Sequence, residues 1–184
     1  MTSRILVVCT GNVCRSPLAE RLLAATLDPS VEVTSRGTHA WTDQDFSPEM
    51  AALLKRRRGI VAGARVAVRL TAADVRGADL VLGMEREHRA AAVRMHPAAV
   101  QRAFTLAEFA RLLTEIDTKL PSRADLDHRV ELLVGRAHRG RRPVPAALDD
   151  IVDPIGQPPR VYEEVFDQID VAVARIAAVI GPRG

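Results

Sequence analysis

Short apolar runs alternate along the chain with stretches of helical periodicity, and this alternation predicts an α/β fold. The first run is rich in β-branched residues and leads directly into a glycine-containing turn, as a buried strand does. Three later runs are shorter or less regular. The expected strands are residues 4–8, 31–35, 79–84 and 100–104.

Helix start signals follow these strands. Ser or Thr at an N-cap, joined by Pro at the next position or by an acidic residue three positions on, marks most of them. Five helices are expected from these signals. They are Ser16-Pro17 to about Thr26, Ser47-Pro48 to Gly59, a short helix that starts at Thr71 with Asp74, about residues 85–95, and Thr105 with Glu108 to about Ile116.

The last helix has the clearest periodicity. Apolar residues recur at steps of three and four, and Gly181-Pro182 ends the pattern. They are Val161, Val165, Ile169, Val173, Ile176 and Ile180. The region before it is less regular: Ser122 with Asp125 can cap a helix through about His138, and a loop rich in Gly, Arg and Pro follows.

Strands that alternate with helices predict a parallel sheet with right-handed crossovers. In such sheets ligands bind at the carboxyl ends of the strands. The loop after residue 8 is therefore the first place to look for a site.

Composition narrows the class of protein. The chain has 184 residues, of which 47% are apolar, 27% charged and 3% aromatic, so it can form an aliphatic core and is not disordered. Cys9 and Cys14 are too few for a secreted disulfide framework. Residues 5–8 are too short an apolar run for a signal-peptide core or a membrane span, so we expect a cytoplasmic protein with reduced thiols.

Charge adds little. The formal net charge is +3, and the basic clusters at Lys55–Arg58 and Arg136–Arg142 are typical of a solvated helix end and a solvated loop. No aromatic residues are interleaved with them to stack on bases, so we expect no nucleic-acid partner.

Residues 9–17 read Cys-Thr-Gly-Asn-Val-Cys-Arg-Ser-Pro, and their chemistry suits a bound tetrahedral dianion. Backbone N–H groups in a tight loop before a helix can all turn inward. Gly11 and Asn12 tolerate the left-handed backbone that this turn needs, and Arg15 offers a fork of donors. The spacings of nucleotide P-loops and of dinucleotide fingerprints are absent.

Cys9 is the candidate nucleophile. The positive field that holds an anion also lowers a thiol pKa, into roughly the 3.5–7.5 range of activated cysteines. Ser16 can donate to its sulfur. The alternative, a small buried residue at a strand end, is outweighed by the neighbours in the loop, and none of the five histidines has zinc-ligand spacing with the cysteines.

Displacement of an alcohol or phenol from phosphorus also needs a proton donor. Asp149-Asp150-Ile151-Val152-Asp153-Pro154 supplies carboxylates in a loop before the last helix. An Asp-Pro pair alone means little, but beside the cysteine loop it makes Asp153 a candidate acid.

The cysteine loop and the Asp-Pro pair together resemble the low-molecular-weight protein tyrosine phosphatase family of bacterial type. Ser35–Thr38, Leu80–Arg86 and Tyr162–Ile169 are also similar, and the resemblance covers about 1–115 and 148–180. It implies one domain over 1–184, built on a four-stranded parallel sheet with helices on both faces and a phosphate loop between the first strand and the first helix. The stretch 117–147 exceeds the compact family and is expected to be a helical or loop insertion.

The resemblance also implies roles, position by position. Cys9 resembles the nucleophile that forms a phosphocysteine, Arg15 the phosphate-binding arginine and Asp153 the general acid that later activates water. Cys14 resembles a redox guard that traps an oxidised nucleophile as a disulfide. Asn12 and Ser16 resemble residues that support the loop. The phosphate-binding residues would be Thr10, Gly11, Asn12, Val13, Cys14 and Arg15, with no metal or cofactor.

One departure concerns the pocket wall. Many members carry Tyr just after Asp-Pro, where this chain has Ile155-Gly156. Trp41 matches an aromatic residue after the second strand and is the candidate wall instead, the alternative being a packing residue.

The predicted function is a protein tyrosine phosphatase. Its partners would be phosphotyrosine proteins, tyrosine kinases among them, and inorganic phosphate would be product and inhibitor. Three alternatives stay open: an arsenate reductase coupled to a small thiol, a phosphate- or phosphotyrosine-binding module without turnover, and a basic nucleic-acid binder. A relay-type reductase is disfavoured because no cysteine follows Cys14.

Overall fold

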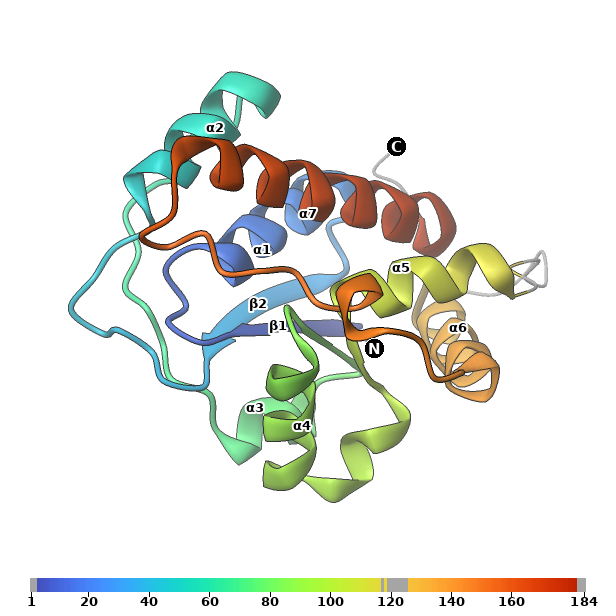
Figure 1. Ribbon diagram of the computed structural model, residues 1–184. Helices are drawn as coiled ribbons and strands as arrows, with labels where there is room; N and C mark the ends of the chain where they lie inside the picture. Colours follow the sequence, from blue (N-terminus) through green and yellow to red (C-terminus); the bar gives the residue numbers. More distant parts are fainter. Residues whose placement is uncertain (1–2, 117, 119–125, 182–184) are drawn as a thin grey trace.

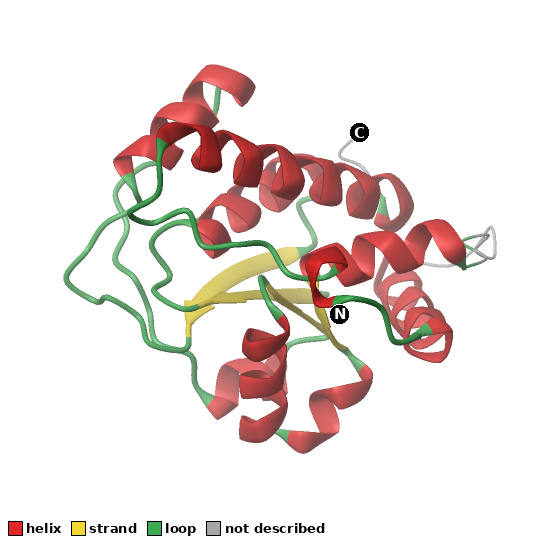
Figure 2. Ribbon diagram, viewed as in Figure 1, coloured by secondary structure: helices red, strands yellow, loops and turns green. Residues whose placement is uncertain are grey.

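The computed structural model describes residues 3–116, 118 and 126–181, and its centre is one parallel sheet between layers of helices (Figures 1 and 2). Its strands are β1 (Arg4–Cys9), β2 (Glu32–Gly37), β3 (Leu80–Gly83) and β4 (Ala103–Thr105), in the order β2-β1-β3-β4. All pairings are parallel. The predicted α/β class is confirmed.

The strand order reverses direction between β1 and β3. From β1 the chain first adds β2 on one side, then crosses back to place β3 and β4 on the other. The loops that leave the carboxyl ends of β1 and β3 therefore diverge, which opens a crevice between them. Cys9 ends β1 at this crevice, and Met84 and Glu85 follow β3 there.

Helices cover both faces of the sheet. One layer holds α1 (Arg15–Thr26), α2 (Pro48–Arg58), α5 (Leu106–Glu115) and α7 (Pro159–Ile180), and the other holds α3 (Ala72–Gly77), α4 (Arg86–Met95) and a short 3₁₀ helix (Pro97–Gln101) (Figure 1). Helix α6 (Leu126–Gly140) packs against α5 and α7, and a second 3₁₀ helix (Ala146–Leu148) follows it. None of the described helices combines the length and the hydropathy that a membrane span needs.

The alternation along β1 divides the core in two. Ile5 and Val7 face the larger cluster, formed with α1, α5 and α7, while Leu6 and Val8 face the smaller one under α3 and α4. Successive side chains of a strand point to opposite faces, so a strand buried on both sides must be apolar throughout. This explains the unbroken run that marked β1 in the sequence.

Most of the predicted helix signals are confirmed. Ser47 accepts a hydrogen bond from the Met50 N–H, and Gly59 ends α2 in the left-handed region with φ 69°. Capping boxes at Thr71 and Thr105 begin α3 and α5.

Several boundaries differ from the prediction by one or two residues, three elements show a structural reason for the difference, and one predicted helix start lies outside the described residues. Helix α1 begins at Arg15 after Cys14, because the Ser16 hydroxyl turns to the cysteine loop instead of capping the helix. Strand β2 extends to Gly37, which pairs with Cys9, and β4 starts at Ala103 because the residues before it form the 3₁₀ helix. The Ser122–Asp125 cap falls in the segment that is not described.

The basic cluster at the end of α2 pairs with acidic residues along one face of α7. These ion pairs are Arg56–Glu163, Arg57–Asp167 and Arg58–Asp170. The acidic partners are spaced by three and four residues, so they lie on one side of α7. The cluster therefore joins two helices rather than forming an isolated cationic patch.

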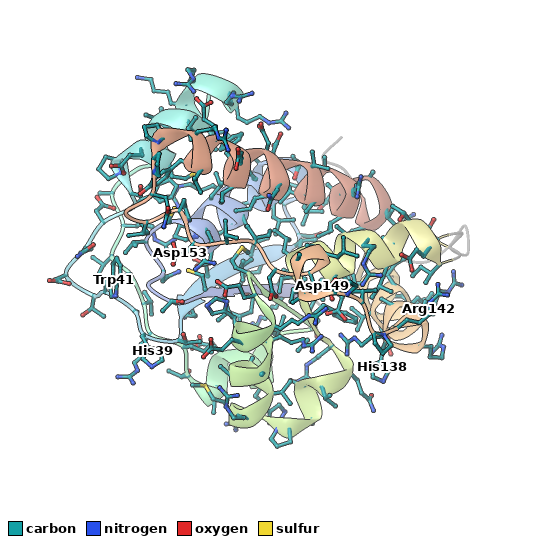
Figure 3. The ribbon with its side chains drawn as sticks, viewed as in Figure 1. His39, Trp41, His138, Arg142, Asp149 and Asp153 are labelled. Atoms are coloured by element: carbon teal, nitrogen blue, oxygen red, sulfur yellow. The ribbon has the colours of Figure 1, made fainter. Side chains whose placement is uncertain are left out.

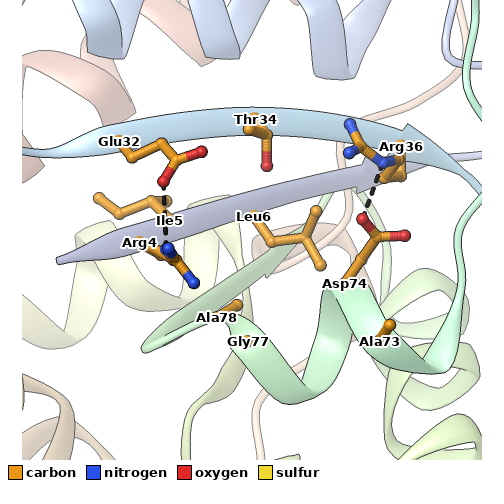
Figure 4. Close-up of a pocket in the computed structure, with 10 residues that line it drawn as sticks. All are labelled: Arg4, Ile5, Leu6, Glu32, Thr34, Arg36, Ala73, Asp74, Gly77 and Ala78. Atoms are coloured by element: carbon orange, nitrogen blue, oxygen red, sulfur yellow. Dashed lines mark hydrogen bonds and ion pairs between the residues drawn. The ribbon is translucent and has the colours of Figure 1, made fainter. Parts of the chain in front are cut away.

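A cavity of about 360 Å³ lies where β1, β2 and α3 meet, with Leu6 and Thr34 along it (Figure 4). The ion pairs Arg4–Glu32 (3.1 Å) and Arg36–Asp74 (3.0 Å) stand beside it. Asp74 also serves the capping box of α3, so one carboxylate both starts the helix and attaches it to the edge strand.

Candidate active site

The loop between β1 and α1 turns its carbonyl oxygens outward. Those of Cys9, Thr10, Gly11 and Val13 accept hydrogen bonds from the N–H groups of Thr38, His39, Trp41 and Ser47 at 2.7–3.0 Å. In a trans peptide the N–H points opposite to the C=O, so the N–H groups that follow these carbonyls face the inside of the loop. A ring of inward N–H groups at a helix N-terminus is an anion-binding arrangement.

Gly37 allows the neighbouring segment to lie this close. A Cβ added there would stand 2.6 Å from the Thr10 carbonyl oxygen, a distance that no real Cβ tolerates. The contact between β2 and the loop therefore depends on a residue without a side chain.

Cys9 lies at the bottom of the loop and is 3% exposed. Its Sγ is 2.9 Å from the Ser16 Oγ and accepts from the Asn12 N–H at 3.3 Å. The sulfur therefore has one backbone donor, the Asn12 N–H, and lies within hydrogen-bond distance of the Ser16 hydroxyl, which can also donate to it.

Asn12 holds the turn. It is the one non-glycine residue with positive φ in the described part of the chain, at 57°. Its Nδ2 donates to Ser16 (3.0 Å) and Ser35 (2.8 Å), and its Oδ1 accepts from the Val68 N–H (2.9 Å) and from Arg65 (3.1 Å). All the hydrogen bonds of this buried amide tie the loop to other segments.

The network continues beyond Asn12. Ser35 donates to Glu20, and Arg65 donates to both Glu20 (2.9 Å) and Ser35 (3.1 Å). The loop therefore rests on α1, β2 and the segment that follows α2.

Arg15 joins three loops of the site and is 1% exposed. Its Nη1 donates to Glu85 and to the Ile151 carbonyl (2.7 Å), and its Nη2 donates to Asp153 (2.7 Å). Within the described residues its Nε–H makes no hydrogen bond, so the Nε–Nη2 edge retains donors for a ligand.

His88 links the loop to the end of β3. Its Nδ1 accepts from the Glu85 N–H at 3.0 Å, so the ring proton is on Nε2, which lies 2.9 Å from the Thr10 hydroxyl. Burial lowers the pKa of His88, and the nearby positive charge of Arg15 lowers it further. The imidazole is therefore neutral near pH 7.

A narrow pocket opens above Cys9. Trp41, Val13 and Ile155 line it with apolar surface, and Arg15 and Asp153 supply the charges. Trp41 lies over Gly11, where an added Cβ would be 3.2 Å from the indole ring. Figure 3 shows Trp41 and Asp153 on the same side of the molecule, well apart from His138 and Arg142.

Cys14 lines the same pocket, and both cysteines are free thiols. Burial raises the pKa of Cys14, and the negative charges of Cys9 and Asp153 raise it further. Cys14 is therefore protonated near neutral pH, which sets it apart from a nucleophile. Its role as a redox guard stays a prediction.

The structure brings together the residues that the sequence singled out. Cys9, Arg15, Trp41 and Asp153 line one pocket, and Asn12 and Ser16 contact each other beneath it. The residues that the sequence analysis missed are Glu20, Ser35, Arg65, Glu85 and His88. Ser35 and Glu85 stand in segments that carried the resemblance, but nothing in the sequence marks Arg65, which reaches the loop from 53 residues away.

Comparison with known proteins gives one family. The pattern of the family described as "Low molecular weight phosphotyrosine protein phosphatase" matches residues 4–133. The chain is 31% identical over 177 residues to a protein-arginine-phosphatase of Geobacillus stearothermophilus, which covers 96% of this chain and 95% of that protein. It is 42% identical over 93 residues to the low molecular weight protein-tyrosine-phosphatase Etp of Escherichia coli, over 50% of this chain and 62% of Etp.

Solved structures agree. The YwlE arginine phosphatase of Geobacillus stearothermophilus superimposes with a TM-score of 0.70 at 31% identity, over 96% of this chain and 91% of that one. The tyrosine phosphatase Wzb of Escherichia coli in complex with phosphate superimposes with a TM-score of 0.69 at 25% identity, over 98% and 94%.

Replacement of Asn12 should separate the backbone effect from the side-chain network. Asn12→Gly should lower the free energy of unfolding by about 2 kcal/mol, because Ser16, Ser35 and the Val68 N–H lose the buried amide that binds them. Asn12→Ala should cost about 1 kcal/mol more, because Cβ disfavours positive φ. Urea denaturation measures both. Gly63→Ala is the control for strain alone, since Gly63 has φ 66° and open space around it; equal stability of the two Asn12 variants would contradict this account.

The His88 contacts predict a pH dependence. Because the folded pKa lies below the unfolded value of 6.5, only the unfolded chain takes up this proton as the pH first falls. The contribution of His88 to stability is therefore present above that value and is lost as the pH falls towards the folded pKa. The stability difference between wild type and His88→Asn should narrow between about pH 7.5 and about pH 5. Urea denaturation at each pH tests this, and a constant difference would show that the ring is not held neutral.

Proposed function

The chain belongs to the low molecular weight phosphotyrosine protein phosphatase family and is a phosphatase, and we propose that it hydrolyses phosphotyrosine in proteins through a phosphocysteine intermediate. One observation carries the proposal. The buried guanidinium of Arg15 pairs with Asp153, a residue 138 positions away, and both residues line the pocket above Cys9. Nucleophile, anion-binding group and proton donor thus share one pocket.

In the first step the phosphate occupies the ring of inward N–H groups and the Nε–Nη2 edge of Arg15. The Cys9 thiolate attacks phosphorus, and the bond from phosphorus to the phenolic oxygen breaks. Asp153, at the rim of the pocket, donates a proton to that leaving oxygen. The products are phosphocysteine and tyrosine.

In the second step Asp153, now a carboxylate, takes a proton from water, whose oxygen attacks phosphorus. The phosphorus–sulfur bond breaks, which returns the Cys9 thiolate and releases inorganic phosphate. Ser16 lies 2.9 Å from the sulfur, where its hydroxyl can donate to the thiolate in both steps. Arg15 and the loop amides bind the charge that develops on phosphoryl oxygens.

Apolar walls favour an aryl phosphate. Trp41, Val13 and Ile155 can pack against the ring of a phosphotyrosine, and none of them carries a charge. Trp41 is 38% exposed, so its ring has free surface for such a contact.

Phosphoarginine is the second candidate substrate. The similarity to a protein-arginine-phosphatase extends over nearly the whole chain, whereas the similarity to Etp extends over half of it. Two carboxylates, Glu85 and Asp153, contact Arg15 and could bind a substrate guanidinium. The pocket itself has apolar walls, which is why we place phosphotyrosine first.

A direct comparison tests both substrates. Two peptides of one sequence, with phosphotyrosine or phosphoarginine at the same position, should differ in kcat/KM by about 10-fold or more in favour of phosphotyrosine. Trp41→Ala should lower kcat/KM for the phosphotyrosine peptide by about 10-fold, the value of one aromatic contact, and leave an alkyl phosphate within about 2-fold. The readout is released phosphate.

Cys9→Ser provides the background for this assay, because near neutral pH a serine hydroxyl is a far poorer nucleophile than a cysteine thiolate. Wild-type turnover that does not exceed this background would refute a phosphatase with Cys9 as its nucleophile and favour a binding module. A preference for the phosphoarginine peptide would overturn the choice of substrate alone.

A further inference from the structure

The segment that carries Asp153 leaves the core at one buried carboxylate. Asp149 is 3% exposed, whereas Val152, three residues later, is 56% exposed. Asp153 lies at the pocket, only four residues beyond Asp149 (Figure 3). Four residues of extended chain span at most about 14 Å, so the place of Asp149 restricts where the acid can be.

Two arginines hold the Asp149 carboxylate. Arg86, at the start of α4, contacts its Oδ2 at 2.9 Å, and Arg111, in the middle of α5, contacts its Oδ1 at 3.1 Å. The Asp149 side chain is 4% exposed. A buried carboxylate is costly unless both oxygens are paired, so this geometry strongly favours one position for the residue.

Hydrogen bonds around Asp149 also hold the chain in place. The Thr105 hydroxyl donates to the Asp149 carbonyl at 2.6 Å, and the Arg86 N–H donates to Asp150 at 2.7 Å. The Ile151 N–H then donates to the Met84 carbonyl at 2.9 Å. The chain is therefore attached to the ends of β3 and β4 just before it reaches the pocket.

The same attachment reaches Arg15. Arg86 directly follows Glu85, which pairs with Arg15, and the Ile151 carbonyl accepts from Arg15. The position of Asp149 and the position of the anion-binding guanidinium are thus set by one short stretch after β3.

We propose that Asp149, held by Arg86 and Arg111, is a positioning residue that keeps the Asp153 carboxyl within reach of the leaving oxygen. This inference rests on the proposed function, in which Asp153 is the general acid. Asp149 touches neither the phosphate nor the nucleophile and acts through Asp153. It also gives the segment after α6 a role, because the chain returns from α6 to the site through Asp149.

The test exploits the leaving group. Phenyl phosphate needs protonation of its leaving oxygen, whereas 2,4-dinitrophenyl phosphate releases a stable anion and does not. Asp149→Asn should lower kcat/KM for phenyl phosphate by about 10- to 100-fold, the effect of a misplaced catalytic group, and that for 2,4-dinitrophenyl phosphate by less than about 2-fold. A loss of folded protein would instead lower both equally.

Asp170→Asn is the matched control. Asp170, on α7, is also a carboxylate held by an arginine of another helix, Arg58 of α2, which contacts its Oδ2 at 2.5 Å and its Oδ1 at 2.6 Å. Its kcat/KM should stay within about 2-fold of wild type for both substrates, since an ion pair away from the acid does not orient it.

A second variant guards against misfolding of Asp149→Asn. Arg111→Gln removes one of the two arginine partners of Asp149 and changes a residue of α5, outside the segment that carries Asp153. The Arg111 side chain is 19% exposed, so water can reach its place. It should show the same selective loss for phenyl phosphate. Combined with Asp153→Ala, either variant should cause no further loss, because an absent acid cannot be misplaced.

The outcomes are distinct. Equal loss for both substrates, a loss that multiplies with that of Asp153→Ala, or no loss in either variant would overturn the positioning role. If Asp153→Ala itself shows no dependence on the leaving group, the acid assigned under the proposed function fails instead. If wild type shows no turnover above Cys9→Ser, the phosphatase proposal fails as a whole.

Discussion

The buried guanidinium of Arg15 is the constraint on which the site depends. A cation that is 1% exposed must be paired, and its partners come from the loops after β3 and before α7. Glu85 and Asp153 are 70 and 138 residues away in sequence, yet both meet this one side chain. The pairing draws the three loops of the pocket together. It also fixes Arg15 with its Nε–Nη2 edge available, so the residue that organises the site is the same one that can bind phosphate.

The sheet makes this convergence possible. With the order β2-β1-β3-β4, β1 and β3 are neighbours, and the loops that follow them diverge from the same edge of the sheet. The segment that carries Asp153 crosses above these loops (Figure 1). The underside of the cysteine loop is held by a different device, the left-handed turn at Asn12, whose amide binds Ser16, Ser35, Arg65 and the backbone of Val68. Ion pairs of Arg15 therefore organise the mouth of the pocket, and the Asn12 amide, supported by Arg65 and Glu20, organises its base.

Local signals were readable from the sequence, and long-range pairs were not. The buried run of β1, the caps at Ser47, Thr71 and Thr105, and the loop from Cys9 to Pro17 depend on residues close in the chain. Helix α1 starts before the predicted cap because Ser16, a good N-cap residue, uses its hydroxyl on Cys9 instead. Arg65, His88 and Arg111 carry no motif, since their partners are fixed only by the tertiary fold. The sequence therefore named the chemistry of the site and two supports of its loop, Asn12 and Ser16, but not the supports that come from more distant segments.

The proposed reaction requires that Cys9 form a covalent bond to phosphorus. The most direct measurement is rapid acid quench during turnover of an aryl phosphate, followed by mass spectrometry of the peptide that carries Cys9 and Cys14. With 2,4-dinitrophenyl phosphate, whose leaving oxygen needs no proton, the Asp153→Asn variant lacks only the base for the second step and should accumulate the intermediate. A phosphoryl group should appear on Cys9 and be absent from the Cys9→Ser variant. Phosphate on Cys14, or steady turnover by wild type with no phosphoryl peptide at any time, would contradict it.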